Sequence, residues 1–272
     1  MKTKKMPAIL FVVLCVLLSN CFGKTEQAAV NNSNAEEKKE PVASSSSNNR
    51  NQAAKASDFG YVINEQKSGV IVTYYTGSAT EVTVPDRLDN LPVTGIRGSE
   101  RLFKGSPITG ISLPDTISII PAEAFRDCKN LRNIKFPANL SSIEASAFRG
   151  CTSISSIKLP ANLSTIGESA FRGCMNLSGI AMGNSVTRIH AYAFYGNERL
   201  TNVTLSENLV TIGNDAFYNC IELTDINVPV TLTTFTRRSS WENVSNAFAW
   251  CHKLPLATRD KLITQGYPAA QF

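Results

Sequence analysis

Apolar side chains recur along this chain with a fixed period of 23 residues, beginning at Ile108 and continuing through five complete rows to Glu222. The clearest column is phenylalanine, at Phe125, Phe148, Phe171, Phe194 and Phe217. Four more columns keep the same register, and in the second row they hold Ile134, Phe136, Ile143 and Ala147. Such columns indicate an internal structural repeat. A sixth row begins at Leu223 and reaches its phenylalanine, Phe248, after an eight-residue insertion.

One row is too short to bury its own apolar side, but stacked rows bury each column against its neighbours. The segment Ile157–Pro160 alternates apolar and polar residues before it reaches proline. This alternation predicts a strand with one face inward, and proline ends the strand because it has no N–H to donate. The repeat therefore predicts a mostly β solenoid of about seven irregular coils whose strands pair in parallel.

Both ends of the repeat region differ from the rows and are predicted to be caps, because open sheet edges invite aggregation. Residues 59–107 contain two apolar segments, Tyr61–Ile63 and Val70–Tyr75, which predict a β-hairpin followed by an irregular first repeat. Residues 108–254 hold the repeats, with the insertion at about 236–246. Residues 255–272 form the second cap, a short helix that stops before Gly266.

The N-terminus predicts export. Three lysines precede an apolar run of eleven residues, Ala8–Leu18, whereas a membrane-spanning helix needs about 20. Residues 1–20 therefore predict a secretory signal peptide. The segment Leu17–Cys21 looks like a bacterial lipobox, although Asn20 replaces the usual small residue, and it predicts lipidation of Cys21. An ordinary signal peptide followed by an incidental cysteine is the alternative.

Residues 21–58 contain almost no large apolar side chains, so they are predicted to form a lipidated N-terminus and a disordered tether. The formal charge of +5 falls to +2 once residues 1–20, with three lysines and no acidic residue, are removed. So small a charge favours neither a nucleic-acid partner nor a polybasic contact with lipid. Membrane attachment is thus predicted through the lipid alone.

The second and third rows, LRNIKFPANLSSIEASAFRGCTS and ISSIKLPANLSTIGESAFRGCMN, resemble the repeat of the BspA-like leucine-rich-repeat proteins of bacterial surfaces. The resemblance covers roughly residues 79–254, and row four departs from it at Met182, Gly183 and Asn197. It implies a right-handed leucine-rich-repeat solenoid at the outer membrane or cell surface. It also implies adhesion to a protein ligand, either a host extracellular protein or a protein of another cell. A periplasm-facing lipoprotein that scaffolds envelope proteins is the alternative.

The cysteines beyond the signal peptide and Cys21 occupy one slot of the repeat, at Cys128, Cys151, Cys174, Cys220 and Cys251. Row four holds Asn197 in this slot. A position that accepts both residue types favours a small, buried group that hydrogen-bonds to the backbone. The thiols share one orientation and are odd in number, so the sequence predicts buried free thiols in place of disulfides.

No pattern of catalytic or metal-binding residues stands out. The chain has two histidines, His190 and His252, and neither belongs to a cluster of the zinc-binding kind. Glycine motifs for phosphate or dinucleotide binding are missing from the sequence. No enzyme activity, cofactor or metal is therefore predicted.

The non-core columns are the candidates for protein binding, since a solenoid presents them as extended faces. The column after the phenylalanines carries Arg126, Arg149, Arg172, Tyr195 and Tyr218. Lys135 and Lys158 lie beside the predicted strand, and Trp241 lies in the insertion. Arginine, tyrosine and tryptophan are enriched at interaction hot spots. A solvated ridge, and a tryptophan folded over the last coil, are the alternatives.

Overall fold

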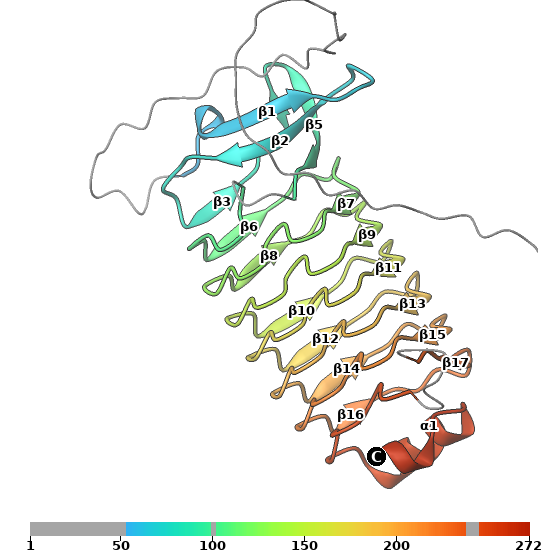
Figure 1. Cartoon of the computed structure of the whole chain (residues 1–272). Coiled ribbons are helices and arrows are strands. Elements are labelled where there is room, and N and C mark those ends of the chain that lie inside the picture. Colours follow the sequence, from blue (N-terminus) through green and yellow to red (C-terminus); the bar gives the residue numbers. More distant parts are fainter. Residues whose placement is uncertain (1–52, 99–101, 238–244) are drawn as a thin grey trace, which may run out of the picture. The chain divides into compact units, whose positions relative to one another are not determined.

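The computed structural model describes residues 53–98, 102–237 and 245–272 (Figure 1). The signal peptide, Cys21, the greater part of the tether and Trp241 lie outside these residues, so their predictions stay predictions. In the described part the chain is mostly β, as predicted, with one short α-helix near the C-terminus.

The N-terminal cap contains the predicted hairpin. After a short 3-10 turn, η1 (Ala56–Asp58), strands β1 (Phe59–Ile63) and β2 (Val70–Tyr75) pair antiparallel. The sequence did not predict that β5 (Leu91–Ile96) pairs parallel with β2, or that β4 (Arg87–Leu88) pairs with β5. These four strands form one sheet.

Each coil contributes one strand to a first series, and its members pair in parallel within two sheets. The series is β3 (Glu81–Thr83), β6 (Gly110–Ser112), β8 (Asn133–Lys135), β10 (Ser156–Lys158), β12 (Gly179–Ala181), β14 (Asn202–Thr204) and β16 (Asp225–Ile226). The 23-residue period sets the register, so that Ile157 pairs with Ile180. One strand per coil gives the predicted seven turns.

A second series of two-residue strands forms a continuous six-stranded parallel sheet. It consists of β7 (Ile119–Ile120), β9 (Ser142–Ile143), β11 (Thr165–Ile166), β13 (Arg188–Ile189), β15 (Thr211–Ile212) and β17 (Thr234–Phe235). Two residues are too few to show an alternating pattern, so the sequence predicted only an apolar pair here.

The core consists of the predicted columns. The phenylalanine rings stack from coil to coil: Phe148 and Phe171 have centroids 5.3 Å apart, and Phe171 and Phe194 have centroids 5.6 Å apart. Phe103 and Phe248 extend the stack at its two ends. The neighbouring isoleucine and alanine columns are buried with it. Each coil therefore completes the core of the next one.

The turn around each phenylalanine is also bonded to the next coil. The Phe125 N–H donates to the Ala147 carbonyl at 2.8 Å, and the Phe148 N–H donates to Ala170 at the same distance. Two residues of each turn from Phe125 to Phe217 have left-handed backbone conformations, for example Ser146 at φ 57° and Gly150 at φ 73°. Glycine is common at the second position because it adopts positive φ without strain.

The C-terminal cap is the predicted helix, α1 (Leu256–Thr264), which ends before Gly266 at φ +94°. The helix buries Leu262, and the following turn buries Tyr267 before η2 (Ala269–Gln271). The Tyr267 hydroxyl accepts a 3.0 Å hydrogen bond from the Phe248 N–H. A side chain thus replaces the carbonyl that a further coil would have supplied.

Candidate functional site

The residues that follow the phenylalanine column lie at the solenoid surface, because the turn directs each side chain away from the core. The five predicted members of this column are half-buried. Arg126 pairs with Glu123 and with the Asp127 carboxylate, 3.4 Å from its Nε. Lys104 also bonds Glu123, at 2.8 Å, and these two cations lower the pKa of that carboxyl. Arg126 is therefore already neutralised by its own neighbours.

Further along the same column the side chains gather into one cluster. The Arg172 guanidinium lies 4.5 Å from the Tyr195 ring centroid and 5.7 Å from that of Tyr192. The Tyr195 ring stacks on Tyr218 at 5.0 Å with an interplanar angle of 4°. We call Arg172, Tyr192, Tyr195 and Tyr218 the arginine–tyrosine patch. Cation–π contact and ring stacking hold these side chains in place before any ligand arrives.

Tyr192 is a member of the patch that the sequence did not predict. Its column holds Glu123, Ser146, Ser169 and Asp215 in the other rows, and all of these residues share its left-handed backbone conformation. One tyrosine in a polar column gives no repeated signal. Only the turn geometry, which brings the ring centroids of Tyr192 and Tyr195 to 6.0 Å, shows that Tyr192 belongs to the patch.

The lysines predicted as binding residues lie on a different face. Lys135 is exposed on β8 and Lys158 is exposed on β10. Arg149 belongs to the phenylalanine turns but makes no ion pair with the described residues. The predicted binding set therefore divides between two faces. The turn face holds Arg126, Arg149 and the predicted members of the arginine–tyrosine patch, and the strand face holds the two lysines. Trp241 is outside the described residues.

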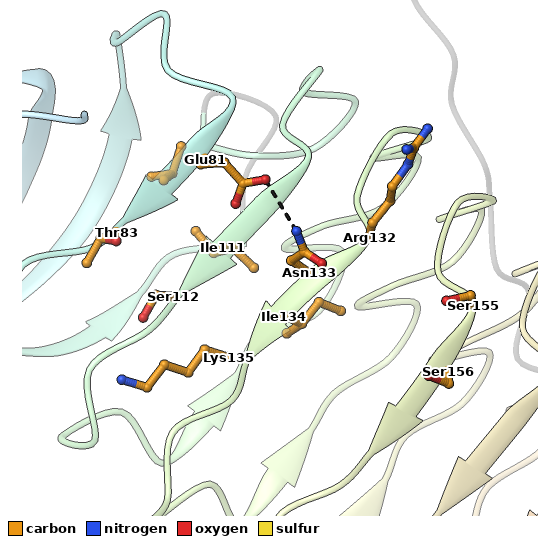
Figure 2. Close-up of a pocket in the computed structure, with 11 residues that line it drawn as sticks. Glu81, Thr83, Ile111, Ser112, Arg132, Asn133, Ile134, Lys135, Ser155 and Ser156 are labelled. Atoms are coloured by element: carbon orange, nitrogen blue, oxygen red, sulfur yellow. Dashed lines mark hydrogen bonds between the residues drawn. The ribbon is translucent and has the colours of Figure 1, made fainter. Parts of the chain in front are cut away.

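A hollow of about 520 Å³ lies on the strand face, and Figure 2 shows the residues that line it. It is lined by β3, β6 and β8, and at one end by Ser155 and Ser156. The Glu81 carboxylate at its rim accepts hydrogen bonds from Thr109 at 2.8 Å and from Asn133 at 3.4 Å. The Glu81 carboxylate is therefore already hydrogen-bonded within the protein.

A second aromatic residue that the sequence analysis missed is Trp250, which is 54% exposed. Its ring packs edge-on against His252 with centroids 5.4 Å apart. Trp250 occupies the left-handed turn position that glycine holds in four of the other coils, with φ 68°. The signal that could have found it is this replacement of a glycine by the bulkiest side chain.

The five repeat cysteines are free and buried, as predicted. Each thiol donates to the carbonyl of a phenylalanine of the preceding coil; the Cys151 Sγ lies 3.0 Å from the Phe125 carbonyl and the Cys174 Sγ 3.2 Å from that of Phe148. Burial raises the pKa of Cys128 and of Cys174 to about 12. Thiols held in this form are poor nucleophiles, so their role is structural.

The prediction of a backbone hydrogen bond in this slot is wrong for Asn197. Its side chain is buried, and neither its Oδ1 nor its Nδ2 has a partner in the described part of the chain. An amide needs more hydrogen-bond partners than a thiol in the same space. The slot offers one carbonyl to a thiol donor, whereas the Asn197 amide makes no hydrogen bond in it.

Groups suited to metal binding do not assemble in the described residues. No cluster of three histidine, cysteine or acidic side chains lies close enough to hold a metal ion there. His190 is half-buried, and burial, together with the nearby Arg188, lowers its pKa. None of the helices described is long and apolar enough to cross a membrane.

The model of the BspA type leucine rich repeat region matches residues 97–198 and 119–255, in six copies. Together these ranges cover more than half of the chain. The chain belongs to this family. BspA-type repeats form scaffolds that generally bind proteins and typically are not enzymes. No curated protein matches the chain.

Solved structures of leucine-rich-repeat proteins are similar to this chain. The T. pallidum leucine rich repeat protein is 27% identical with a TM-score of 0.72, over 79% of this chain and 97% of that one. A leucine-rich repeat protein from Bacteroides ovatus is 22% identical with a TM-score of 0.50, over 65% and 54%. A leucine rich cell surface protein from Faecalibacterium prausnitzii is 23% identical with a TM-score of 0.49, over 65% and 53%.

Proposed function

We propose that this chain is a lipid-anchored protein of the bacterial surface that uses its solenoid to bind a protein ligand. The ligand is a host extracellular protein or a surface protein of another cell. The observation that carries this proposal is the arginine–tyrosine patch, with its guanidinium 4.5 Å from one ring and two rings stacked at 5.0 Å. Membership of the BspA-type family supports the same function.

The patch has the properties of a binding anchor. Arginine and tyrosine contribute most of the energy at many interfaces, and side chains that are already ordered lose little entropy when a partner binds. Arg172 packs against rings, whereas Arg126 faces two carboxylates. The charge of Arg172 is therefore available to an acidic group of the ligand.

Loss of the patch is expected to weaken ligand binding. We expect the double substitution Arg172→Ala and Tyr195→Ala to reduce binding at least about tenfold, because it removes the cation and the central ring. The measurement is binding of the purified mature chain to a panel of immobilised host extracellular proteins. The matched control is Arg199→Ala, which removes an exposed arginine of the same region. Equal losses in both variants would count against the patch.

Surface exposure separates this proposal from a periplasmic scaffold. Protease treatment of intact cells is expected to digest the repeat domain while a periplasmic marker protein survives. Protection of the domain until the outer membrane is permeabilised would instead favour the scaffold.

Anchoring is tested at the lipobox cysteine. We expect Cys21→Ser to move the protein from the detergent phase to the aqueous phase of a Triton X-114 partition, because the acyl chains provide the anchor. Cys15→Ser is the matched control, since Cys15 lies inside the predicted signal peptide. Continued partition of the Cys21→Ser protein into detergent would exclude lipidation at this residue.

A further inference from the structure

The first strand series is interrupted once. Strands β3, β6 and β8 form one sheet and β10, β12, β14 and β16 form another, so that β8 and β10 are not paired. On the opposite face of the same two coils β9 and β11 remain paired, with Ser142 opposite Thr165. The opening is therefore confined to one face, where Figure 2 shows β8 standing apart from β10, the strand that carries Ser156.

The interruption leaves backbone groups without the partners that they have elsewhere in the series. The N–H groups of Leu113, Leu159 and Met182 each donate to the carbonyl of a residue 22 positions further on, at 2.9 to 3.3 Å. The equivalent bond from Phe136 to the Lys158 carbonyl is missing from the described structure. β8 and β10 thus present two free strand edges to each other.

One departure from the repeat coincides with the opening. Phe136 stands in a column that holds Leu113 and Leu159 in the adjacent rows, and its ring packs edge-on against Phe148 at 5.8 Å and 79°. The phenylalanine ring is larger than the leucine side chain that it replaces. Ile134 and Phe136 are only partly buried, whereas Ile111 and Ile157 are 3% and 6% exposed.

Positive charge flanks the opening. Lys135 on β8 and Lys158 on β10 are exposed on its two sides, and Arg132 precedes β8. Arg132, Lys135 and Ser155 also line the adjacent hollow of about 520 Å³. Glu81, its acidic lining residue, is bonded within the protein. The opening therefore complements an extended segment with acidic side chains on one face.

We propose that the opening between β8 and β10 is a strand-addition site for an extended, acidic segment of a partner protein. The segment pairs its backbone with the free edge of β8. Its alternate side chains point inward onto Ile134 and Phe136, and the acidic ones point outward between Lys135 and Lys158. This inference rests on the proposed protein-binding function, but it uses a surface other than the arginine–tyrosine patch.

A peptide of defined pattern tests the site. The probe is a fluorescein-labelled peptide of about eight residues that alternates valine and glutamate, titrated into the purified mature chain with fluorescence anisotropy as the readout. We expect saturable binding, and about tenfold weaker binding of a valine–lysine peptide. The double variant Lys135→Glu and Lys158→Glu should reverse this preference. Absence of saturable binding by the valine–glutamate peptide would overturn the proposal.

The decisive variant is Phe136→Leu, which restores the residue of the adjacent rows and is expected to close the sheet without harming the fold. We expect it to weaken peptide binding at least about tenfold, because the free edge becomes paired. In hydrogen exchange, the Phe136 amide of the unaltered chain should exchange faster than that of Leu159 and become protected when the peptide is added. Equal exchange of the two amides in the free chain, or unchanged peptide binding by Phe136→Leu, would overturn the site.

The arginine–tyrosine patch provides the remaining control. Arg172→Ala with Tyr195→Ala should leave peptide binding unchanged, because these residues lie on the turn face. If the unaltered chain binds the peptide but no extracellular protein, the strand-addition proposal stands and the proposed function is contradicted. If it binds an extracellular protein but not the peptide, the proposed function stands and the strand-addition proposal is contradicted.

Discussion

Replacing Phe171 by alanine is expected to lower the free energy of unfolding by about 3–5 kcal/mol. The side chain is fully buried and stacks on Phe148 and Phe194, at 5.3 and 5.6 Å. The substitution removes contacts at two coil interfaces at once, and a solenoid has no distant core that compensates. The measurement is urea denaturation followed by circular dichroism, on the mature chain that carries Cys21→Ser.

The control for this prediction comes from the same coil. Met175 is 55% exposed, so Met175→Ala is expected to change stability by less than about 0.5 kcal/mol. A loss below about 1 kcal/mol for Phe171→Ala would contradict the assignment of the phenylalanine column to the core.

Asn197→Cys is expected to stabilise the protein by about 1–3 kcal/mol, which is the cost of burying an unpaired polar group. Asn197 is fully buried and its amide has no partner in the described residues. A thiol in this slot should donate to the preceding phenylalanine carbonyl, as the Cys220 Sγ does to Phe194 at 3.3 Å. Chemical denaturation under reducing conditions measures the change without disulfide formation.

The reverse exchange is the matched control. Cys174→Asn should destabilise the protein by a similar amount, because it introduces the same unpaired amide one coil earlier. If Asn197→Cys were neutral or destabilising, the Asn197 amide would have partners, such as a buried water, that satisfy it.

The scaffold was predictable because the same apolar pattern recurs in five successive rows of the sequence. Phe148 alone says little, but the same residue at the same position in five rows fixes the period, the inward face and the parallel register together. The buried thiols followed from the same comparison of rows. Two-residue strands such as β9 were not predictable as strands, since so short a segment has no periodicity.

The candidate sites were less predictable because they depend on departures from the repeat. Tyr192 joins Arg172 and Tyr195 only through the shape of the turn, and the other residues of its column are polar. Phe136 stands in a column that holds leucine in the adjacent rows, and this exception coincides with the one interruption of the strand series in the described residues. The repeat thus predicts the scaffold, and single exceptions to it mark the sites that we propose for binding.

The bond from the Phe248 N–H to the Tyr267 hydroxyl bears on assembly. The other phenylalanine turns donate an N–H to a carbonyl of the next coil. An unoccupied N–H at the last turn would offer the same bond to a coil of a second molecule. At the last turn the donor is already occupied, and α1 follows directly. The Tyr267 hydroxyl therefore occupies the donor that a further coil would need, and together with α1 it opposes head-to-tail stacking of solenoids into a fibre at this end.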